Sequence, residues 1–237
     1  MSVACYLMAA GNGMRLRPIT DDFQKCLLPV DGKPMLEWWL DAAFESECFD
    51  KVYVNLHHMA EQVEEWLSFY SKKKHRKVFR IDERRRLLGT AGTLLHKADV
   101  FSDFMIAYTD TFCWDVFTRL PRIMAKWDRL SKYYSAGLVT FDPPGDRSTG
   151  NMLVGEDGVV REFSEKKSDS GVAWAGIMFA GKGFIGKIRN DDVDLAGDVL
   201  PRMSGEMVVV HHAEAYDIGR GVEHYERFQR DFKKPGV

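Results

Sequence analysis

A glycine loop directly after an apolar run, near the start of the sequence, constrains this chain more than any other feature. The run over residues 3–9 leads into Gly11-Asn12-Gly13. A short apolar run that ends at such a loop predicts a buried central strand. The glycines let backbone N–H groups approach an anion closely, and the cations Arg15 and Lys25 follow. The segment therefore predicts a phosphate site that suits a triphosphate.

Two common phosphate loops fit this segment badly. A dinucleotide fingerprint needs a third glycine where this chain has Leu16, and a Walker loop needs Gly-Lys-Ser/Thr, which the segment lacks. The segment instead resembles the sugar-1-phosphate nucleotidylyltransferases, whose signature reads roughly A-G-x-G-T-R-L-x-P-L-T and then P-K-P-L-L-P-V. Met14 stands where Thr is usual, and Gln24-Lys25-Cys26 replaces Pro-Lys-Pro. The alternative is a glycine turn before a solvated basic face, but a motif this long rarely arises by accident.

Composition limits the class of protein. The chain has 237 residues, 45% of them hydrophobic, which is enough for the core of one large α/β domain. A formal net charge of −2 argues against nucleic acid and against an anionic membrane surface as partners. The four cysteines are far apart and lack a C-x-x-C spacing, so neither a zinc knuckle nor a redox pair is indicated. We find no leader pattern and no apolar run of membrane-spanning length, so we expect a cytoplasmic enzyme.

Helix and strand patterns alternate along the first half of the chain. We expect strands over 51–56, 78–81 and 104–108 and helices over 35–44, 60–70 and 90–97. This alternation predicts a doubly wound α/β fold with a mostly parallel sheet.

The second half is less regular. We expect a helix over 120–126, a strand over 136–140, a hairpin around Asp157-Gly158, a strand over 208–210 and a C-terminal helix. We interpret these strands as a small antiparallel part that carries the acceptor substrate. The prediction is one domain over 1–237, in which 1–118 mainly bind the nucleotide and 119–237 mainly bind the sugar phosphate. The resemblance implies a Rossmann-like nucleotidyltransferase fold, in a short form without the C-terminal left-handed helix domain.

Two cations are the candidate catalytic residues. Ligands of open parallel sheets collect at the carboxyl ends of strands, where the glycine loop would lie. Phosphoryl transfer needs charge neutralisation and in-line positioning more than covalent chemistry. The resemblance implies that Arg15 clamps the departing phosphates and that Lys25 lies near the α-phosphorus and the acceptor phosphate. Surface salt bridges are the alternative for both residues.

Two carboxylates are the candidate metal ligands. Asp110 follows the strand over 104–108, in a position that reads Gly-Asp in the family and Thr109-Asp110 here. Asp217 lies in Tyr216-Asp217-Ile218-Gly219, which resembles the family segment D-I-G-T. The resemblance implies that both bind Mg²⁺, which prefers hard oxygen ligands together with substrate phosphates. The alternatives are a helix N-cap for Asp110 and a turn for Asp217.

A second nucleotide element follows at Leu88-Gly89-Thr90-Ala91-Gly92. It resembles the family's L-G-T-A-G, which contacts the base and the sugar of the nucleotide, although Thr90 also suits a helix N-cap. Glu83 matches an acidic or amide position near the base in some relatives. Because L-G-T-A-G is more typical of guanylyltransferases for mannose-like sugars, we expect GTP as the donor. The candidate nucleotide-binding residues are Ala9, Ala10, Gly11, Asn12, Gly13, Met14, Glu83, Gly89 and Thr90.

The acceptor side has weaker signals. Glu165 and Lys166 resemble the family's F-x-E-K-P, which implies contacts with sugar hydroxyls and the sugar phosphate; solvated charges at a strand end are the alternative. Gly150 resembles the glycine of Y-G-x-V, which lets backbone approach the sugar. Trp174 stands where N-A-G-I-Y has Asn, which suggests an unusual acceptor or an aromatic face against the sugar ring.

The sequence therefore predicts a Mg²⁺-dependent sugar-1-phosphate nucleotidylyltransferase that uses a nucleoside triphosphate and a mannose- or heptose-type 1-phosphate. Uridylyl, cytidylyl or thymidylyl transfer is the alternative within the same class. A catalytically silent subunit that senses nucleotide sugars is a different class, and the presence of Arg15, Lys25, Asp110 and Asp217 together argues against it. The sequence does not decide whether the chain forms a homo-oligomer.

Overall fold

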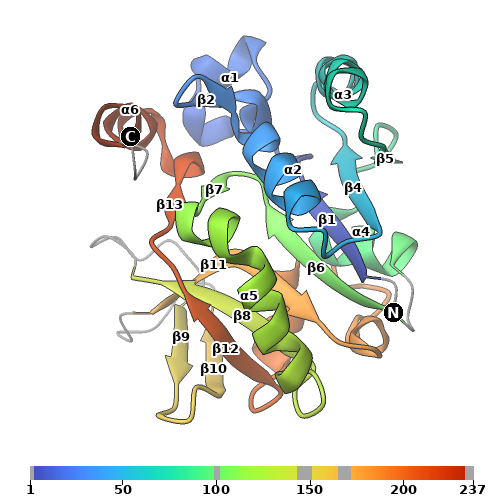
Figure 1. The fold of residues 1–237 in the computed structure, drawn as a ribbon, viewed down its shortest axis with the longest axis vertical. Helices are drawn as coiled ribbons and strands as arrows, with labels where there is room; N and C mark the ends of the chain where they lie inside the picture. The colour runs from blue at the N-terminus through green and yellow to red at the C-terminus, as the bar shows by residue number, and fades with distance from the viewer. Residues whose placement is uncertain (1–2, 99–101, 143–150, 165–171, 233–237) are drawn as a thin grey trace.

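The structure is a computed structural model that describes residues 3–98, 102–142, 151–164 and 172–232. Figure 1 shows a twisted sheet through the middle of the molecule, with helices against it. The parallel region of this sheet comes from the first half of the chain. Its strands lie in the order β5 (Val78–Asp82), β4 (Lys51–Leu56), β1 (Val3–Met8) and β6 (Asp103–Tyr108). Their carboxyl ends therefore share one edge of the sheet.

The other strands attach through β11 (Ala173–Ala180), which pairs antiparallel to β6. β8 (Ala136–Phe141) pairs with β11, and β12 (Met207–His212) pairs in parallel with β8. β9 (Asn151–Val154) and β10 (Val160–Ser164) form a hairpin beside the start of β11. The nine-stranded sheet is mixed and mostly parallel around β1, which confirms the predicted doubly wound α/β class.

Two short ribbons lie outside the main sheet. β2 (Pro29–Val30) pairs with β3 (Lys33–Pro34), and β7 (Thr111–Phe112) pairs with β13 (Tyr216–Asp217). The second ribbon matters for the site because it places Asp217 opposite Thr111, the residue after Asp110.

Helices and helical turns connect these strands. The α-helices of the described residues are α1 (Ile19–Asp22), α2 (Met35–Glu45), α3 (Ala60–Lys74), α4 (Gly89–Lys97), α5 (Trp114–Leu130) and α6 (Val222–Asp231). Shorter helical turns cover Met14–Leu16, Lys25–Leu27, Phe184–Lys187, Leu195–Val199, Leu200–Arg202 and Ile218–Arg220.

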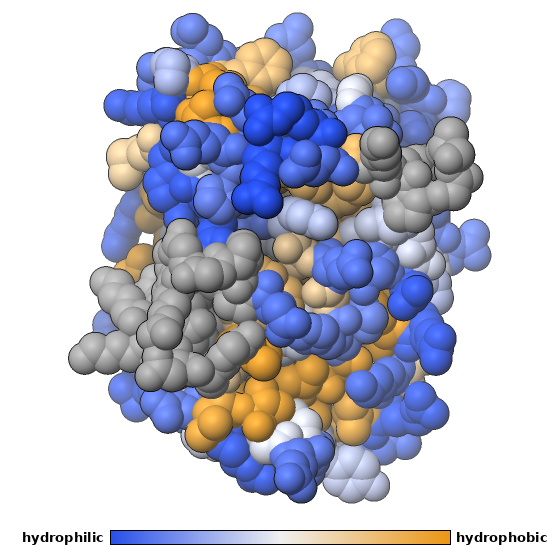
Figure 2. Space-filling view, turned by 90° about the vertical axis from the view of Figure 1, so that its left-hand side faces the viewer, coloured by the Kyte–Doolittle hydropathy of each residue, from blue (hydrophilic) through white to orange (hydrophobic). Residues whose placement is uncertain are grey.

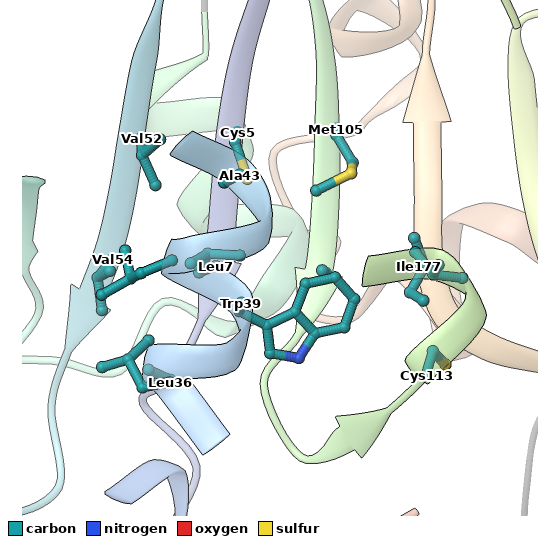
Figure 3. Close-up of a cluster of buried hydrophobic side chains, with 14 of the residues drawn as sticks. Cys5, Leu7, Leu36, Trp39, Ala43, Val52, Val54, Met105, Cys113 and Ile177 are labelled. Carbon is teal, nitrogen blue, oxygen red and sulfur yellow. The ribbon is translucent and has the colours of Figure 1, made fainter. Parts of the chain in front are cut away.

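The sheet is buried on both faces because its central strands are apolar at most positions. In β1, Cys5 and Leu7 join one core cluster, and the alternate residues Tyr6 and Met8 join a second cluster on the opposite face. Figure 3 shows the first cluster, in which Trp39 of α2 lies over the strands that carry these side chains. The Trp39 indole N–H donates to Thr111 O at 3.1 Å, so its polar atom is also satisfied.

The second half differs from the prediction in three ways: one helix is longer than expected, one strand pairs in the other direction, and one strand was missed. The helix predicted over 120–126 spans Trp114–Leu130, because Val116, Leu120, Ile123 and Trp127 form a continuous apolar face despite an internal proline. The strand predicted over 208–210 pairs in parallel rather than antiparallel. β11, the eight-residue strand that joins the two parts of the sheet, was not predicted as a strand.

The surface is mainly polar. Figure 2 shows hydrophilic residues over most of one face, with hydrophobic residues gathered toward its lower part. No helix in the described ranges is both long enough and apolar enough to span a membrane.

Candidate active site

The glycine loop follows the end of β1, as the sequence predicted. Gly13 has φ +63°, and a Cβ there would lie 2.9 Å from the methyl carbon of Thr20. The Thr20 hydroxyl donates to Gly13 O at 2.7 Å. The positive φ favours glycine, and the close approach of Thr20 leaves no room for a Cβ without a shift.

The start of the loop is held from β4. Asn55 Oδ1 accepts from the N–H groups of Ala9 and Ala10 at 2.7 and 3.1 Å. Asn55 Nδ2 donates to Glu83 Oε1 at 3.2 Å, and Glu83 also accepts from Thr93 Oγ1 at 2.6 Å. Glu83 is only 2% exposed and lies behind the cavity wall, where it orients Asn55. Its predicted contact with a base stays a prediction.

A cavity of about 250 Å³ opens beside the loop, at the carboxyl ends of β1 and β6. Its lining includes seven of the predicted residues, which are Ala9, Ala10, Gly11, Lys25, Gly89, Thr90 and Asp110. It also includes residues that the sequence analysis did not propose for the site, namely Met8, Gln24, Cys26, Asn55, Leu87, Tyr108, Thr109 and Asp194. The predicted residues Asn12, Met14 and Arg15 are exposed and lie outside this lining, with Met14 66% exposed.

Lys25 and Asp110 form an ion pair in the cavity wall. Burial works to raise the pKa of Asp110, but the charge and hydrogen bond of Lys25 outweigh it and hold the pKa below its usual value. Gly219 packs against this pair, since a Cβ there would clash with Lys25 Nζ and lie 2.8 Å from Asp110 Oδ2. A side chain at position 219 would therefore displace the Lys25 ammonium.

The β7 and β13 ribbon brings Asp217 beside this pair. Ile218 N–H donates to Asp110 O at 3.0 Å, and Asp217 Oδ1 accepts from Gly219 N at 2.8 Å, so the predicted turn role also holds. Burial, together with the charge of Asp110, raises the pKa of Asp217 from 3.8 to about 6. Arg15 and Lys25 lower it in part, so both cations act on this carboxylate.

Two neighbouring carboxylates of this kind fit a hard divalent cation. Their mutual repulsion would be relieved by a bound positive charge, and carboxylate oxygens are preferred Mg²⁺ ligands. Among the described residues, no group of three or more His, Cys, Asp or Glu side chains is arranged to hold a metal. The remaining ligands of such an ion would therefore come from phosphates or water.

A third polar group joins α4 to a distant segment on the other side of the cavity. Thr90 Oγ1 donates to Asp194 Oδ2 at 2.9 Å and accepts from Tyr108 Oη at 3.2 Å. Gly89 allows the contact, because a Cβ there would clash with Val193 O. The sequence analysis missed Asp194, which lies 104 residues beyond Thr90 and has no local motif.

The predicted acceptor residues are placed less fully. Trp174 is 5% exposed, its indole N–H donates to Ile177 O at 2.8 Å, and its ring packs edge-on against Tyr108 and Phe163. These are contacts of a core residue, although Tyr108 itself lines the cavity. Gly150, Glu165 and Lys166 lie outside the described residues.

With this geometry in view, comparison with known proteins identifies the family. A family model described as nucleotidyl transferase matches residues 5–216. The chain belongs to this family. The match covers the glycine loop, Lys25 and Asp110, and it ends one residue before Asp217.

Two sequence relatives are nucleotidyltransferases by name, and a solved structure shares the fold. The chain is 28% identical to UTP–glucose-1-phosphate uridylyltransferase of Synechocystis sp., over 83% of this chain and 54% of that protein. It is 27% identical to the putative mannose-1-phosphate guanyltransferase of Sulfolobus acidocaldarius, over 85% and 54%. The chain thus spans about half the length of these relatives. The crystal structure of HddC from Yersinia pseudotuberculosis shares the fold, with a TM-score of 0.77, 23% identity and coverage of 97% and 99%.

Proposed function

We propose that this chain transfers a nucleoside monophosphate from a nucleoside triphosphate to a sugar 1-phosphate and releases pyrophosphate. The observation that carries the proposal is the convergence of Lys25, Asp110 and Asp217 beside a glycine-loop cavity. In the reaction, an oxygen of the acceptor phosphate attacks the α-phosphorus. The bond from that phosphorus to the bridging oxygen breaks, and pyrophosphate leaves with the bonding electrons.

Each charged residue has a part in this reaction. Lys25 neutralises charge at the α-phosphate and the attacking phosphate, while Arg15 at the exposed rim binds the departing phosphates. Asp110 and Asp217 would hold a Mg²⁺ ion, which when bound supplies further charge neutralisation for the phosphates. The loop N–H groups orient the triphosphate for in-line attack. The part of this loop outside the cavity lining contains Asn12, Gly13 and Met14.

For the substrates, we propose GTP and a mannose- or heptose-type 1-phosphate. The L-G-T-A-G resemblance at residues 88–92 and the guanyltransferase among the relatives support the guanine base. The uridylyltransferase relative supports UTP as the second candidate. We place Glu165, Lys166 and Gly150 on the acceptor side by resemblance alone.

A substrate matrix tests the proposal. The purified chain is incubated with each nucleoside triphosphate and a panel of sugar 1-phosphates, and pyrophosphate release is measured with and without Mg²⁺. We expect one dominant pair, with GTP favoured. Nucleotide-sugar binding without pyrophosphate release from any pair would instead support a silent sensing subunit.

A further inference from the structure

Gln24 is a buried amide with an unusual number of contacts at the glycine loop. Gln24 is 1% exposed and lines the cavity. Its Nε2 donates to Ala9 O at 2.9 Å, Gly11 O at 3.1 Å and His58 O at 3.3 Å. Two hydrogens thus serve three carbonyl oxygens, so one of the bonds is shared.

The surroundings fix which way this amide faces. Gln24 Oε1 accepts from Cys26 N at 2.8 Å, while the backbone N–H of Gln24 donates to Gln62 Oε1 at 2.6 Å. A flipped amide would turn its oxygen toward three carbonyls and its NH₂ toward an N–H donor. The observed orientation is therefore the only satisfied one.

These contacts act on the direction of the loop peptides. The only cis peptide bond described is Arg17–Pro18, so the Gly11–Asn12 peptide is trans and its N–H points opposite to its C=O. Because Gln24 binds Gly11 O, the Asn12 N–H is directed away from Gln24. Within the described part of the chain, this N–H has no protein partner. The Ala9–Ala10 peptide is held on both sides, by Gln24 at its oxygen and by Asn55 at its N–H.

We propose that Gln24 is a positioning residue for triphosphate binding, which holds the loop carbonyls so that the loop N–H groups face the nucleotide phosphates. The same residue directly precedes Lys25, so one buried side chain sets the loop and anchors the backbone that carries the catalytic ammonium. The family signature has proline at this position, which has no amide side chain to do this, so the device belongs to this chain's own departure from the pattern. The inference rests on the proposed function, because it assigns the phosphates to this loop.

The test compares variants of nearly the same shape. Gln24→Glu replaces the donor NH₂ with oxygen, and Gln24→Met keeps the length without polar atoms. Calorimetry with inorganic tripolyphosphate measures loop affinity without turnover, and hydrogen exchange follows the amides of residues 9–14. We expect Gln24→Glu to weaken tripolyphosphate roughly 10- to 100-fold and Gln24→Met roughly 10-fold, since lost donors leave buried carbonyls unpaired. Exchange of the loop amides should rise in both variants.

A pH series and a matched control separate positioning from general stability. In Gln24→Glu, protonation of the new carboxylate restores one donor, so the affinity deficit of this variant against wild type should narrow between pH 8 and pH 5.5, whereas the Gln24→Met deficit should not. Gln62→Met removes the contact to the Gln24 backbone but keeps the three Nε2 bonds, so its affinity should stay within roughly threefold of wild type. In turnover, KM for the nucleotide should rise in the Gln24 variants while KM for the acceptor stays the same.

The outcomes also distinguish this inference from the proposed function. If wild type binds tripolyphosphate in a Gln24-dependent way but releases no pyrophosphate from any substrate pair, the inference stands and the proposed function fails. Normal affinity and normal loop exchange in both Gln24 variants would overturn the inference even in an active enzyme. Failure of wild type to bind tripolyphosphate would overturn it as well, and so would a fall in melting temperature with unchanged affinity.

Discussion

The two halves of the molecule are built in different ways. In the first half, a helix follows each parallel strand along the chain. These strands lie in the sheet in the order β5, β4, β1 and β6, so only the connection from β5 to β6 passes across other strands. In the second half, β11 enters the sheet beside β6, and β8 and β12 attach beyond it. The first half is thus specified by local patterns, and the second by pairings between distant residues.

The same difference runs through the site. The nucleotide side is held by short polar contacts among buried groups, such as Asn55 with Ala9 and Ala10. The wall of the cavity opposite the Lys25–Asp110 pair includes Asp194, and the β13 ribbon flanks the pair itself; both come from late in the chain. We therefore expect changes in the second half to act first on folding, and changes beside the glycine loop to act first on turnover.

The largest expected effect is in the second half, at Trp174. Trp174→Asn removes a buried ring and should lower the free energy of unfolding by ~3–5 kcal/mol, as large-to-small aromatic changes do. Thermal unfolding and an acceptor panel are measured together, with Trp127→Asn as a matched buried control on the other face of the sheet. A changed sugar preference with a normal melting temperature would instead place Trp174 in the acceptor pocket. It would also contradict the expectation that changes in the second half act first on folding.

The opposite behaviour is expected for the cations of the first half. Lys25→Ala and Arg15→Ala should each lower turnover ~100-fold or more with the fold intact, since each loses one preorganised charge contact. Arg17→Ala is the control, because Arg17 pairs with Asp21 at the surface, where such pairs contribute ~0–1 kcal/mol. Turnover near the wild-type value in either variant would refute the role assigned to that residue.

The sequence predicted the first half of the chain better than the second half, because the first half is specified by local patterns. The strand over 51–56 and the helix starting at residue 60 were predicted at their observed positions, because their periodicity is local. β11 was missed although it is a continuous apolar run over 173–180, since its motif was interpreted only as an acceptor contact. Its neighbours in the sheet are far away in sequence, so periodicity alone gives no register.

The sequence predicted those site residues that belong to a recognisable motif. It did not predict those whose role depends on being buried against distant segments. The glycine loop and Lys25 were found from their spacing, and they lie together in the structure. Gln24 was noted only as a departure from the family pattern, and its contacts to loop carbonyls depend on a fold that brings distant segments together. A buried polar residue inside a phosphate motif is the signal that would have found it.

Asp110 lies at the boundary between the halves, and its variant should have a smaller effect than the cations. Asp110→Asn makes a poorer Mg²⁺ ligand and removes the partner of Lys25, so we expect a roughly 10- to 100-fold loss of turnover. Asp103→Asn is the control, because Asp103 begins the same strand at its far end. Full activity after exhaustive chelation would contradict the metal proposal.

The smallest effect concerns the pH dependence of stability at Asp217. Because its pKa is raised from 3.8 to about 6, the folded state favours the protonated form. This contribution to stability is fully present below pH 3.8 and is lost as the pH rises through 6. Without divalent cations, Asp217→Asn should therefore be more stable than wild type at pH 7.5 by on the order of 1–3 kcal/mol, with little difference at pH 3.5.

Denaturant unfolding at both pH values measures this difference, and added Mg²⁺ sharpens it. A cation that binds Asp110 and Asp217 stabilises only the folded wild type, so the advantage of Asp217→Asn should shrink as Mg²⁺ is added. Asp198→Asn is the control, because the pKa of Asp198 is lowered and its variant should lose stability at neutral pH instead. An Asp217→Asn variant less stable than wild type at pH 7.5 without metal would show that the folded state does not favour the protonated form of Asp217.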